Sequence, residues 1–482
     1  FGHKHSSIGL TLHFYEREQD YCSHLRVRWL DGVGNILAAK DFHPREALEF
    51  LMEKVEGYCG LEITFFETSK PYRYLKLAGL DYGMELHLGG RELASAVILE
   101  EIDPAGSAVS INTMDFTVHS PLAEFSPLNP NGYFSVLQQR QRLSVGATID
   151  GTKMNMGDFF LDSWEADGKD NIKLHAVDAV GLMDKVQYYG GIYENAPPNQ
   201  VLQSVFASTG AEYVIDEALS QKKLNGYIGI CTARQALGQI ALALGGIVDC
   251  SRSDRVKICT MPQKASILID TNRKFGGQRI GRRPPVTGID IVTHKFVASD
   301  ERYSAFDETL EAGTHTVLFT EPTHTPTVTG ATAAAYSANH IVLTVPTAGR
   351  VTVSGGKYLH SKRGASDNLA EQGANIADNR LKVEGATMLG AENAQDILKR
   401  LRDCCMRGLS TEFSVKLGAE RVADMVMIKS IDGESIRGVI ESMETDLTGG
   451  CLCKMRISAQ RIVTVSVSYA GEIYAGQNLG VL

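Results

Sequence analysis

Short stretches in which every second residue is apolar recur along this chain of 482 residues. The clearest is Leu143–Ile149, where the odd-numbered residues are apolar, and it runs directly into Asp150-Gly151. An Asp-Gly pair tolerates the positive φ angles of a two-residue hairpin turn. Residues 451–469 show the same period, with apolar side chains at every odd position except Arg461. A period of two places alternate side chains on opposite faces of a sheet, so the sequence predicts a chain that is mainly β.

Helical signals are fewer and lie between the β-rich stretches. Thr232 and Gln235 form a capping box, and Gly245 is placed to end the helix that follows. A second amphipathic helix is expected over residues 44–56, because proline is tolerated in a first helical turn. Residues 273–285 are rich in Arg, Lys, Gly and Pro, and we interpret them as a linker. The predicted fold class is therefore mainly β with α+β.

The length indicates several domains. At about 150 residues per domain, the chain has room for roughly three or four. The changes in pattern along the sequence divide it further. We predict an N-terminal β-sandwich-like domain over residues 1–82, a first tube-like β-barrel over 83–190, an α+β module and basic linker over 191–284, a β-rich insert over 285–371, and a second tube-like β-barrel with a helix over 372–482.

Charge and composition exclude several classes of protein. The net charge is −9, whereas a sequence-independent nucleic-acid binder should be basic. No stretch approaches the roughly 18 consecutive apolar residues that a membrane-spanning helix needs. The nine cysteines are odd in number and show no framework spacing, so we expect a reducing compartment rather than a disulfide scaffold.

A few residues have chemistry-bearing side chains, and each is better explained structurally. Cys451 and Cys453 share a strand face, but apolar residues continue that face and no His or Cys pair follows at zinc spacing. We therefore predict that both pack in a core. His3 and His5 are attributed to a flexible terminus. Three further sets are Cys404-Cys405 on an apolar helix face, Gly276-Gly277 to Gly281 in the linker, and Asp158 and Asp162, which flank an apolar strand without marking a glycosidase cleft.

No catalytic signature is present in the sequence. There is no Gly-x-Ser-x-Gly elbow, no His-Glu-x-x-His motif and no phosphate-binding loop motif. We therefore predict no catalytic residue, no cofactor-binding residue, no metal ligand and no cofactor, and we do not expect an enzyme.

A series of short segments follows in a specific order between residues 96 and 260. They are Glu100–Pro104, Ser110–Val118, Leu128–Gly132, Leu137–Gln141, Gly157–Trp164, Tyr188–Gly191 and Gly229–Arg234. Together these segments resemble the hub proteins of phage tails and of related contractile injection particles. The resemblance covers about a third of the chain firmly and extends more weakly through Lys382–Ile462.

This resemblance implies an architecture and a set of partners. Hub proteins of this family carry two tube-like barrels per subunit, so that a trimer presents six barrels to the sixfold tail tube. It implies a homotrimeric ring that binds the tail tube protein and a spike or tip protein, with the tape-measure protein as a further partner. The expected location is a virion tail or phage-like particle assembled in the bacterial cytoplasm, and both contractile and non-contractile particles remain open.

Two other functions remain as alternatives. One is a surface adhesin that uses residues 8–82 or 298–371 to bind a host glycan or protein. The other is a tail-associated peptidoglycan hydrolase. If the hub interpretation holds, DNA passes through the ring without specific binding. We then expect more Asp and Glu than Lys and Arg on the inner wall, because a basic lining would hold the phosphates.

Overall fold

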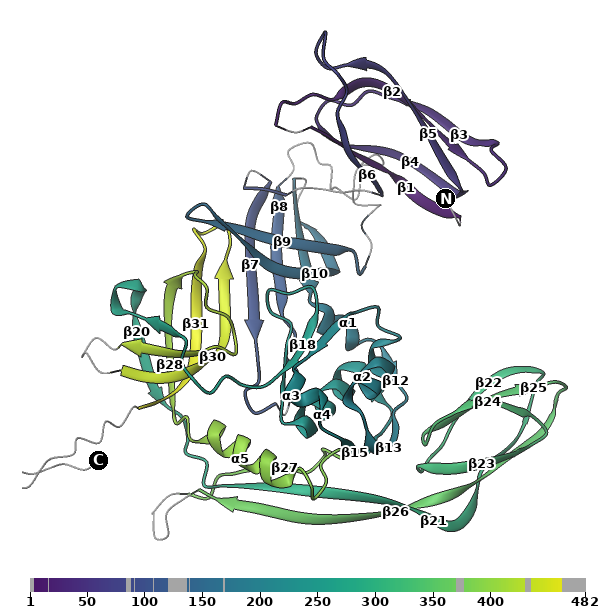
Figure 1. Ribbon diagram of the computed structural model, residues 1–482, viewed down its shortest axis with the longest axis vertical. Coiled ribbons are helices and arrows are strands. Elements are labelled where there is room, and N and C mark those ends of the chain that lie inside the picture. Colours follow the sequence, from purple (N-terminus) through teal and green to yellow (C-terminus); the bar gives the residue numbers. More distant parts are fainter. Residues whose placement is uncertain are drawn as a thin grey trace, which may run out of the picture. The chain divides into compact units, whose positions relative to one another are not determined.

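A computed structural model describes residues 4–15, 17–83, 88–90, 92–106, 108–119, 137, 139–167, 170–369, 377–429 and 435–461. The chain forms two compact units (Figure 1). Unit 1 comprises Phe1–Glu92 and Pro127–Leu137, and unit 2 comprises Leu93–Ser126 and Gln138–Leu482. Strands predominate in both, which confirms that the chain is mainly β. In the ranges described, no helix has the length and apolar character needed to cross a membrane.

Unit 1 contains two three-stranded antiparallel sheets that share one hydrophobic core. One sheet has the order β4 (Leu48–Tyr58), β1 (His5–Phe14), β6 (Leu77–Tyr82), and the other has the order β3 (Ile36–Phe42), β2 (Cys22–Leu30), β5 (Gly60–Thr68). Alternate residues of β1 and β2 fill this core, among them Leu10, Leu12, Leu25, Val27 and Trp29, all fully buried. Alternation in the sequence thus gives each sheet one buried face.

The helix predicted over residues 44–56 is wrong, because most of this segment forms β4. Leu51, Val55 and Tyr58 are buried at spacings of four and three, which resembles one face of a helix. Their pairing with β1 contains two register shifts, both before Gly9. A register shift changes the side to which successive residues point, so irregularly spaced apolar residues reach the same core from a strand.

Unit 2 is built around one eleven-stranded sheet. Its order is β20 (Lys274–Arg282), β28 (Leu409–Lys416), β31 (Leu452–Arg461), β30 (Ser435–Asp446), β7 (Leu93–Glu101), β8 (Thr113–His119), β11 (Asn171–Val177), β10 (Thr152–Asp167), β9 (Arg142–Ile149), with β29 (Met425–Lys429) paired to β30 and β19 (Ile267–Ile269) paired to β29. The strands from the two stretches predicted as barrels meet where β30 pairs antiparallel with β7.

The expectation of two tube-like barrels is corrected by this sheet. No sheet of the described residues closes into a barrel. To close into a barrel, each half would need its edge strand to pair within that half. Instead, β30 and β7 pair with each other, from Ser442 opposite Glu101 to Asp446 opposite Val97. Edge strands pair with whichever strand is in register, and alternation alone does not specify which one that is.

The linker predicted over residues 273–285 is also wrong. Lys274–Arg282 forms β20, which pairs with β28 and places Arg279 opposite Glu412. Gly276 and Gly277 lie within a register shift of this pairing, and both have positive φ. Glycine therefore marks a bulge in a strand here, rather than a connection between domains.

An α+β module follows the first half of the sheet. It contains α1 (Ala179–Met183), β12 (Gln187–Tyr188), β13 (Gly191–Ala196), α2 (Pro198–Phe206), β14 (Tyr213–Ile215), α3 (Glu217–Ser220), β15 (Leu224–Ile228), β16 (Cys231–Thr232), α4 (Ala233–Leu244), β17 (Ile247–Asp249) and β18 (Val256–Cys259). The predicted capping box is confirmed, because Thr232 accepts a hydrogen bond from the backbone N–H of Gln235. Gly245 ends α4 in the left-handed conformation, as predicted.

Two long strands dominate the insert between the module and the last strands of the sheet. β21 (Gly288–Leu310) and β26 (Gly349–Asn368) pair along their length, and Figure 1 shows them as an extended ribbon. The other elements between β21 and β28 are β22 (Gly313–Leu318), β23 (Thr323–Thr329), β24 (Thr332–Tyr336), β25 (His340–Val345), β27 (Arg380–Val383) and α5 (Ala394–Cys405). A 3-10 turn at Thr271–Arg273 precedes β20. We call residues 313–345 the tip; its core includes Ile341 and Leu343.

Candidate functional site

The cysteines named from the sequence lie in different environments. Cys453, on β31, is fully buried, which confirms its predicted core position, and burial raises the pKa of its thiol to about 12. Cys451 is only partly buried, because it precedes β31 with a φ of 55°. The prediction that both face one core is therefore wrong for Cys451. In the part of the chain that the structure describes, no three His, Cys, Asp or Glu side chains are grouped to hold a metal ion.

The other candidates also have local structural roles. His5 begins β1, and its ring stacks on Tyr82 at 5.4 Å, so it belongs to unit 1 rather than to a loose terminus. His3 lies outside the described residues. Cys404 and Cys405 are half buried at the end of α5, where the Cys404 thiol donates to a backbone carbonyl at 3.1 Å.

Asp158 and Asp162 lie on the same strand but have separate partners. Asp158 accepts hydrogen bonds from Arg142 Nε at 3.0 Å and from the Ser144 hydroxyl at 2.7 Å. Asp162 is paired with Lys185. Four residues along β10 correspond to about 13 Å, which exceeds the carboxylate separations of glycosidases. These two side chains therefore do not form a catalytic pair.

A buried ion pair lies where the two halves of the sheet meet, and we call this place the junction. Glu100 comes from β7, and Arg252 comes from the loop between β17 and β18. Both side chains are 1 % exposed, and Arg252 Nε lies 3.5 Å from Glu100 Oε2. Burial raises the pKa of Glu100 to about 7, while the charge of Arg252 opposes this shift. Removing one partner would leave the other charge buried and unpaired.

The backbone at the junction is also specialised. Arg252 adopts a φ of 47° and donates from Nη1 to the carbonyl of Gly418 at 3.3 Å. Its backbone lies against Gly157, which follows a register shift in the β9–β10 pairing and has a φ of 104°. The Arg252 loop thus packs on a bulge of the first half while its side chain reaches Glu100. This arrangement packs the loop against the sheet with both side chains almost fully buried, and it offers no open site.

A buried amide, that of Asn339, links the tip to the module through hydrogen bonds. Asn339 is 3 % exposed. Its Nδ2 donates to the carbonyls of Tyr189 at 2.7 Å and Ile228 at 2.8 Å, and its Oδ1 accepts from the Tyr227 hydroxyl at 2.7 Å. Gly190 allows this approach, because a Cβ there would lie 2.1 Å from the Ile228 carbonyl oxygen. Both parts therefore belong to one packed structure within unit 2.

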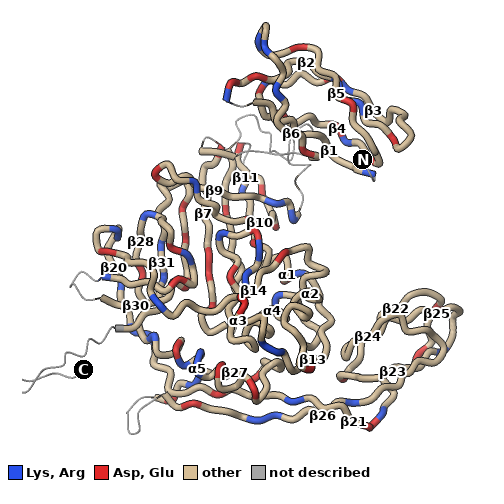
Figure 2. The backbone as a smooth tube through the Cα atoms, viewed as in Figure 1, with Lys and Arg blue, Asp and Glu red and all other residues tan. Residues whose placement is uncertain are grey.

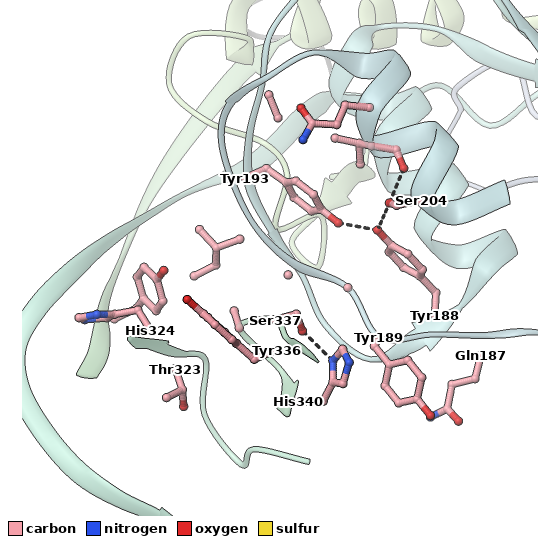
Figure 3. Close-up of a pocket in the computed structure, with 18 of the residues that line it drawn as sticks. Gln187, Tyr188, Tyr189, Tyr193, Ser204, Thr323, His324, Tyr336, Ser337 and His340 are labelled. Carbon is pink, nitrogen blue, oxygen red and sulfur yellow. Dashed lines mark hydrogen bonds between the residues drawn. The ribbon is translucent and has the colours of Figure 1, made fainter. Parts of the chain in front are cut away.

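Beside this anchor lies a pocket of about 700 Å³, which we call the tip pocket (Figure 3). One wall comes from the segment around β12, β13 and α2, and the other comes from the tip and β26. Its aromatic lining includes five tyrosines, Tyr188, Tyr189, Tyr193, Tyr336 and Tyr358. A pocket of this size, lined by rings and a few polar groups, is typical of small-ligand sites.

Hydroxyl groups form a chain along the module wall of the tip pocket. The Tyr188 hydroxyl lies 2.5 Å from the Tyr193 hydroxyl and 2.7 Å from the Ser204 hydroxyl (Figure 3). Burial raises the pKa of Tyr193 well above its usual range, and the neighbouring Tyr188 adds to this shift. On the tip wall, the Ser337 hydroxyl lies 2.8 Å from His340 Nδ1. Burial lowers the pKa of His340, which favours the neutral imidazole.

A second histidine completes the tip wall. His324 Nε2 donates to the Ser299 carbonyl at 3.0 Å, and its Nδ1 lies 2.9 Å from the Thr325 hydroxyl. The ring of Tyr358 meets it edge to face at 5.1 Å. Burial raises the pKa of Tyr358, and Glu194 contributes to the shift. These bonds fix the orientation of His324 by using both ring nitrogens.

The tip pocket is electrically neutral in its lining. Among the described residues that line it there is no Lys, Arg, Asp or Glu. The tip sequence has one charged residue in 33, Glu321, and nine threonines. The segment Tyr188–Gly191 is one of those that carry the resemblance, but no pattern in the sequence predicts a pocket beside it. The missed signal was this uncharged, Thr-rich stretch, which is also visible as the largely tan tip in Figure 2.

Comparisons with known proteins concern the fold. No model of a protein family and no curated protein matches the sequence. Among solved structures, the chain is similar to the 43 kDa tail protein of prophage MuSo2 from Shewanella oneidensis, with 13% identity over 76% of this chain and 94% of that protein and a TM-score of 0.45. It is also similar to the tail protein from Neisseria meningitidis MC58, with 10% identity over 76% and 92% and a TM-score of 0.46. A third is the prophage tail protein gp18 from Listeria monocytogenes EGD-e, with 10% identity over 76% and 94% and a TM-score of 0.40. All three are described as tail proteins.

Proposed function

We propose that this chain is a structural hub or tail-tip protein of a phage tail or phage-like particle, and that it forms a trimeric ring. The observation that carries the proposal is the eleven-stranded sheet, in which two β-rich halves are joined by the β30–β7 pair. A subunit that carries two such halves gives a trimer six of them. That number matches a sixfold tail tube, which is the adaptor role implied by the resemblance of residues 96–260.

Ring formation would use the two ends of this sheet. β9 lies at one end of the strand order and β20 at the other, and among the described strands each has a partner on one side only. Ile280 on β20 is 48 % exposed, although it is apolar. Unpaired edges accept a strand from a neighbouring chain, so subunits could continue the sheet around a ring.

The proposed partners are the tail tube protein on one side and a spike or tip protein on the other, with the tape-measure protein passing between them. DNA would cross the ring without specific binding, consistent with a net charge of −9. Figure 2 shows acidic and basic residues interspersed along the strands of the sheet. We propose that the assembled inner wall carries more Asp and Glu than Lys and Arg. Assembly would take place in the bacterial cytoplasm, and the chain would act without catalysis.

Mass measurement in solution tests this proposal. The purified chain is measured alone and with the tube protein of its own particle, and a complex containing three copies of this chain is expected. A monomer alone does not contradict the proposal if the tube protein induces the trimer. A chain that stays monomeric with its tube protein, or that forms a stable dimer, contradicts it.

A pair of matched variants tests the edge contact. Ile280→Lys places a charge on the β20 edge and should abolish the trimer, because inward or edge lysines block strand pairing. Val33→Lys, at an apolar residue of unit 1 that is 89 % exposed, should leave it intact. A trimer that tolerates Ile280→Lys would move the subunit contact away from this edge.

A further inference from the structure

We propose that the tip pocket binds a neutral saccharide, with one uncharged sugar ring held between the module wall and the tip wall. The inference rests on the lining of this pocket and not on the hub role. It assigns saccharide binding to one defined pocket in unit 2. Sugar binding and trimer formation are measured in separate experiments, so either proposal can be contradicted while the other stands.

The rings at the pocket supply a stacking surface. Tyr336 is 58 % exposed and Tyr189 is 36 % exposed, which is unusual for large aromatic side chains next to a buried anchor. Figure 3 shows Tyr336 and His340 on the tip wall, across from Tyr193 and Tyr188. The face of an aromatic ring is negative, so it attracts the weakly positive C–H groups on one face of a sugar ring. An aromatic pocket therefore accepts a saccharide by its apolar face.

The polar groups at the pocket suit sugar hydroxyls. Tyr189, Tyr336 and Tyr358 bring further hydroxyl groups to the lining. The Ser337 hydroxyl and the imidazole of His340 add a neutral pair that can donate and accept. Hydroxyl groups act as donors and acceptors in turn, as the hydroxyls of a sugar do. Each free sugar hydroxyl can thus be matched without ionising either partner.

The neutrality of the lining selects among ligand classes. A phosphate, sulfate or carboxylate is normally recognised by Arg, Lys or a cluster of backbone N–H groups, and no Arg or Lys lines this pocket in the described residues. Nucleic acid needs positive charge for its affinity. A cationic ligand held by an ion pair would need a carboxylate, which the lining also lacks among the described residues. The volume of about 700 Å³ accommodates a ligand larger than one sugar ring, so an oligosaccharide fits better than a monosaccharide.

Saturation-transfer NMR on the full chain tests the proposal. The probes are neutral trisaccharides with glucose, galactose or N-acetylglucosamine units, and an acidic trigalacturonate as the charged comparison. At least one neutral trisaccharide should receive saturation and bind at least tenfold more tightly than trigalacturonate. No transfer to any neutral probe at millimolar concentration, or tighter binding of the acidic probe, would overturn the proposal.

Variants locate the binding. Tyr336→Ala should weaken binding of the neutral probe at least tenfold, and Tyr336→Phe should retain most of it because the ring remains. Tyr74→Ala is the matched control, since Tyr74 is a tyrosine of unit 1 that is 89 % exposed. A thermal unfolding midpoint equal to that of the wild type shows that each variant is folded. Gln200→Trp gives a second route, because it fills the pocket from α2 without removing a ring. Binding that survives both Tyr336→Ala and Gln200→Trp, or that is lost in Tyr74→Ala, rules out the tip pocket as the site.

Discussion

The junction and the tip pocket, both in unit 2, differ in the charge and in the burial of their polar side chains. The junction buries two ionisable side chains, Glu100 and Arg252, each 1 % exposed. The tip pocket contains no charged lining residue among those described, and its rings and hydroxyls are partly open. Buried charges are costly to separate from their partners, whereas exposed neutral groups can be changed with little effect on folding. We therefore expect substitutions at the junction to alter stability and those at the tip pocket to alter binding.

The largest expected effect is at the junction. Arg252→Met should lower the free energy of unfolding of unit 2 by about 3–5 kcal/mol, because Glu100 would remain buried without its partner. The measurement is urea unfolding followed by Trp164 fluorescence in a Trp29→Phe background. The control is Arg350→Met, which breaks an exposed pair with Asp307 and should cost about 0–1 kcal/mol. A loss below about 1 kcal/mol for Arg252→Met would show that the buried pair at the junction contributes no more to stability than the exposed control pair.

The next effect is on pH dependence close to the junction. Asp178 caps α1 and accepts hydrogen bonds from the backbone N–H groups of Asn112 and Gly181, both at 3.0 Å. Burial raises its pKa from 3.8 to about 7, and Asp249 adds to the shift. Between these two values the folded state binds more protons than the unfolded state, so stability falls as the pH rises through this window.

Asp178→Asn should remove the part of that fall that Asp178 causes, because the amide still caps the helix but does not ionise. Glu100, whose pKa is also raised to about 7, should still contribute to the fall. Between pH 4 and pH 7, the free energy of unfolding should fall by on the order of 3 kcal/mol more in the wild type than in Asp178→Asn. Urea unfolding at a series of pH values provides the measurement. Asp300→Asn, at an exposed position, should leave the profile unchanged. An unchanged profile in Asp178→Asn would show that Asp178 is not the titrating group.

A smaller effect is expected at the anchor beside the tip pocket. Asn339→Ala removes the hydrogen-bond partner of two backbone carbonyls, one of them buried, and of one tyrosine hydroxyl, at a cost of about 1–3 kcal/mol. Hydrogen exchange should become faster in residues 313–345 while exchange in the central sheet stays as in the wild type. Asn379→Ala, which loses one exposed bond to Pro285, is the control. Faster exchange throughout unit 2 would mean that the tip and the junction unfold together.

The smallest effect separates two neighbouring cysteines. Cys453→Ser buries a hydroxyl in the core of the second half-sheet and should cost about 1 kcal/mol or somewhat more. Cys451→Ser lies in a partly exposed turn and should change the free energy of unfolding by less than about 0.5 kcal/mol. Equal losses for the two variants, measured by urea unfolding, would contradict the burial difference between them.

The sequence predicts best those features that depend on local contacts. Thr232, Gln235 and Gly245 define α4 because a cap and its partner lie within one turn of helix. The hairpin at Asp150-Gly151 is confirmed for the same reason, since Ile149 pairs directly with Thr152. Period-two alternation likewise identifies strands without knowledge of their partners.

Features that depend on distant pairing were missed. β20 pairs with β28 across more than 120 residues of sequence, so its glycines and arginines resemble a linker when taken alone. The β30–β7 pair joins segments that alternation treats as separate closed barrels. The tip pocket brings Tyr188 together with Tyr336 and Tyr358, and no local pattern links these three positions. Register and tertiary packing decide all three cases.

The two long strands of the insert have a mechanical consequence. β21 has 23 residues, and at about 3.3 Å per residue its contour length is roughly 75 Å. A rotation of about 5° at one end of a stiff ribbon of that length displaces the other end by roughly 6 Å. The pairing is irregular between Ala298 and Arg302 and again between Ser304 and Phe306, so bending concentrates there. While Asn339 holds the tip to the module, the β21–β26 ribbon is fixed at both ends. Without that attachment, the tip would swing about the irregular pairing in the middle of the ribbon.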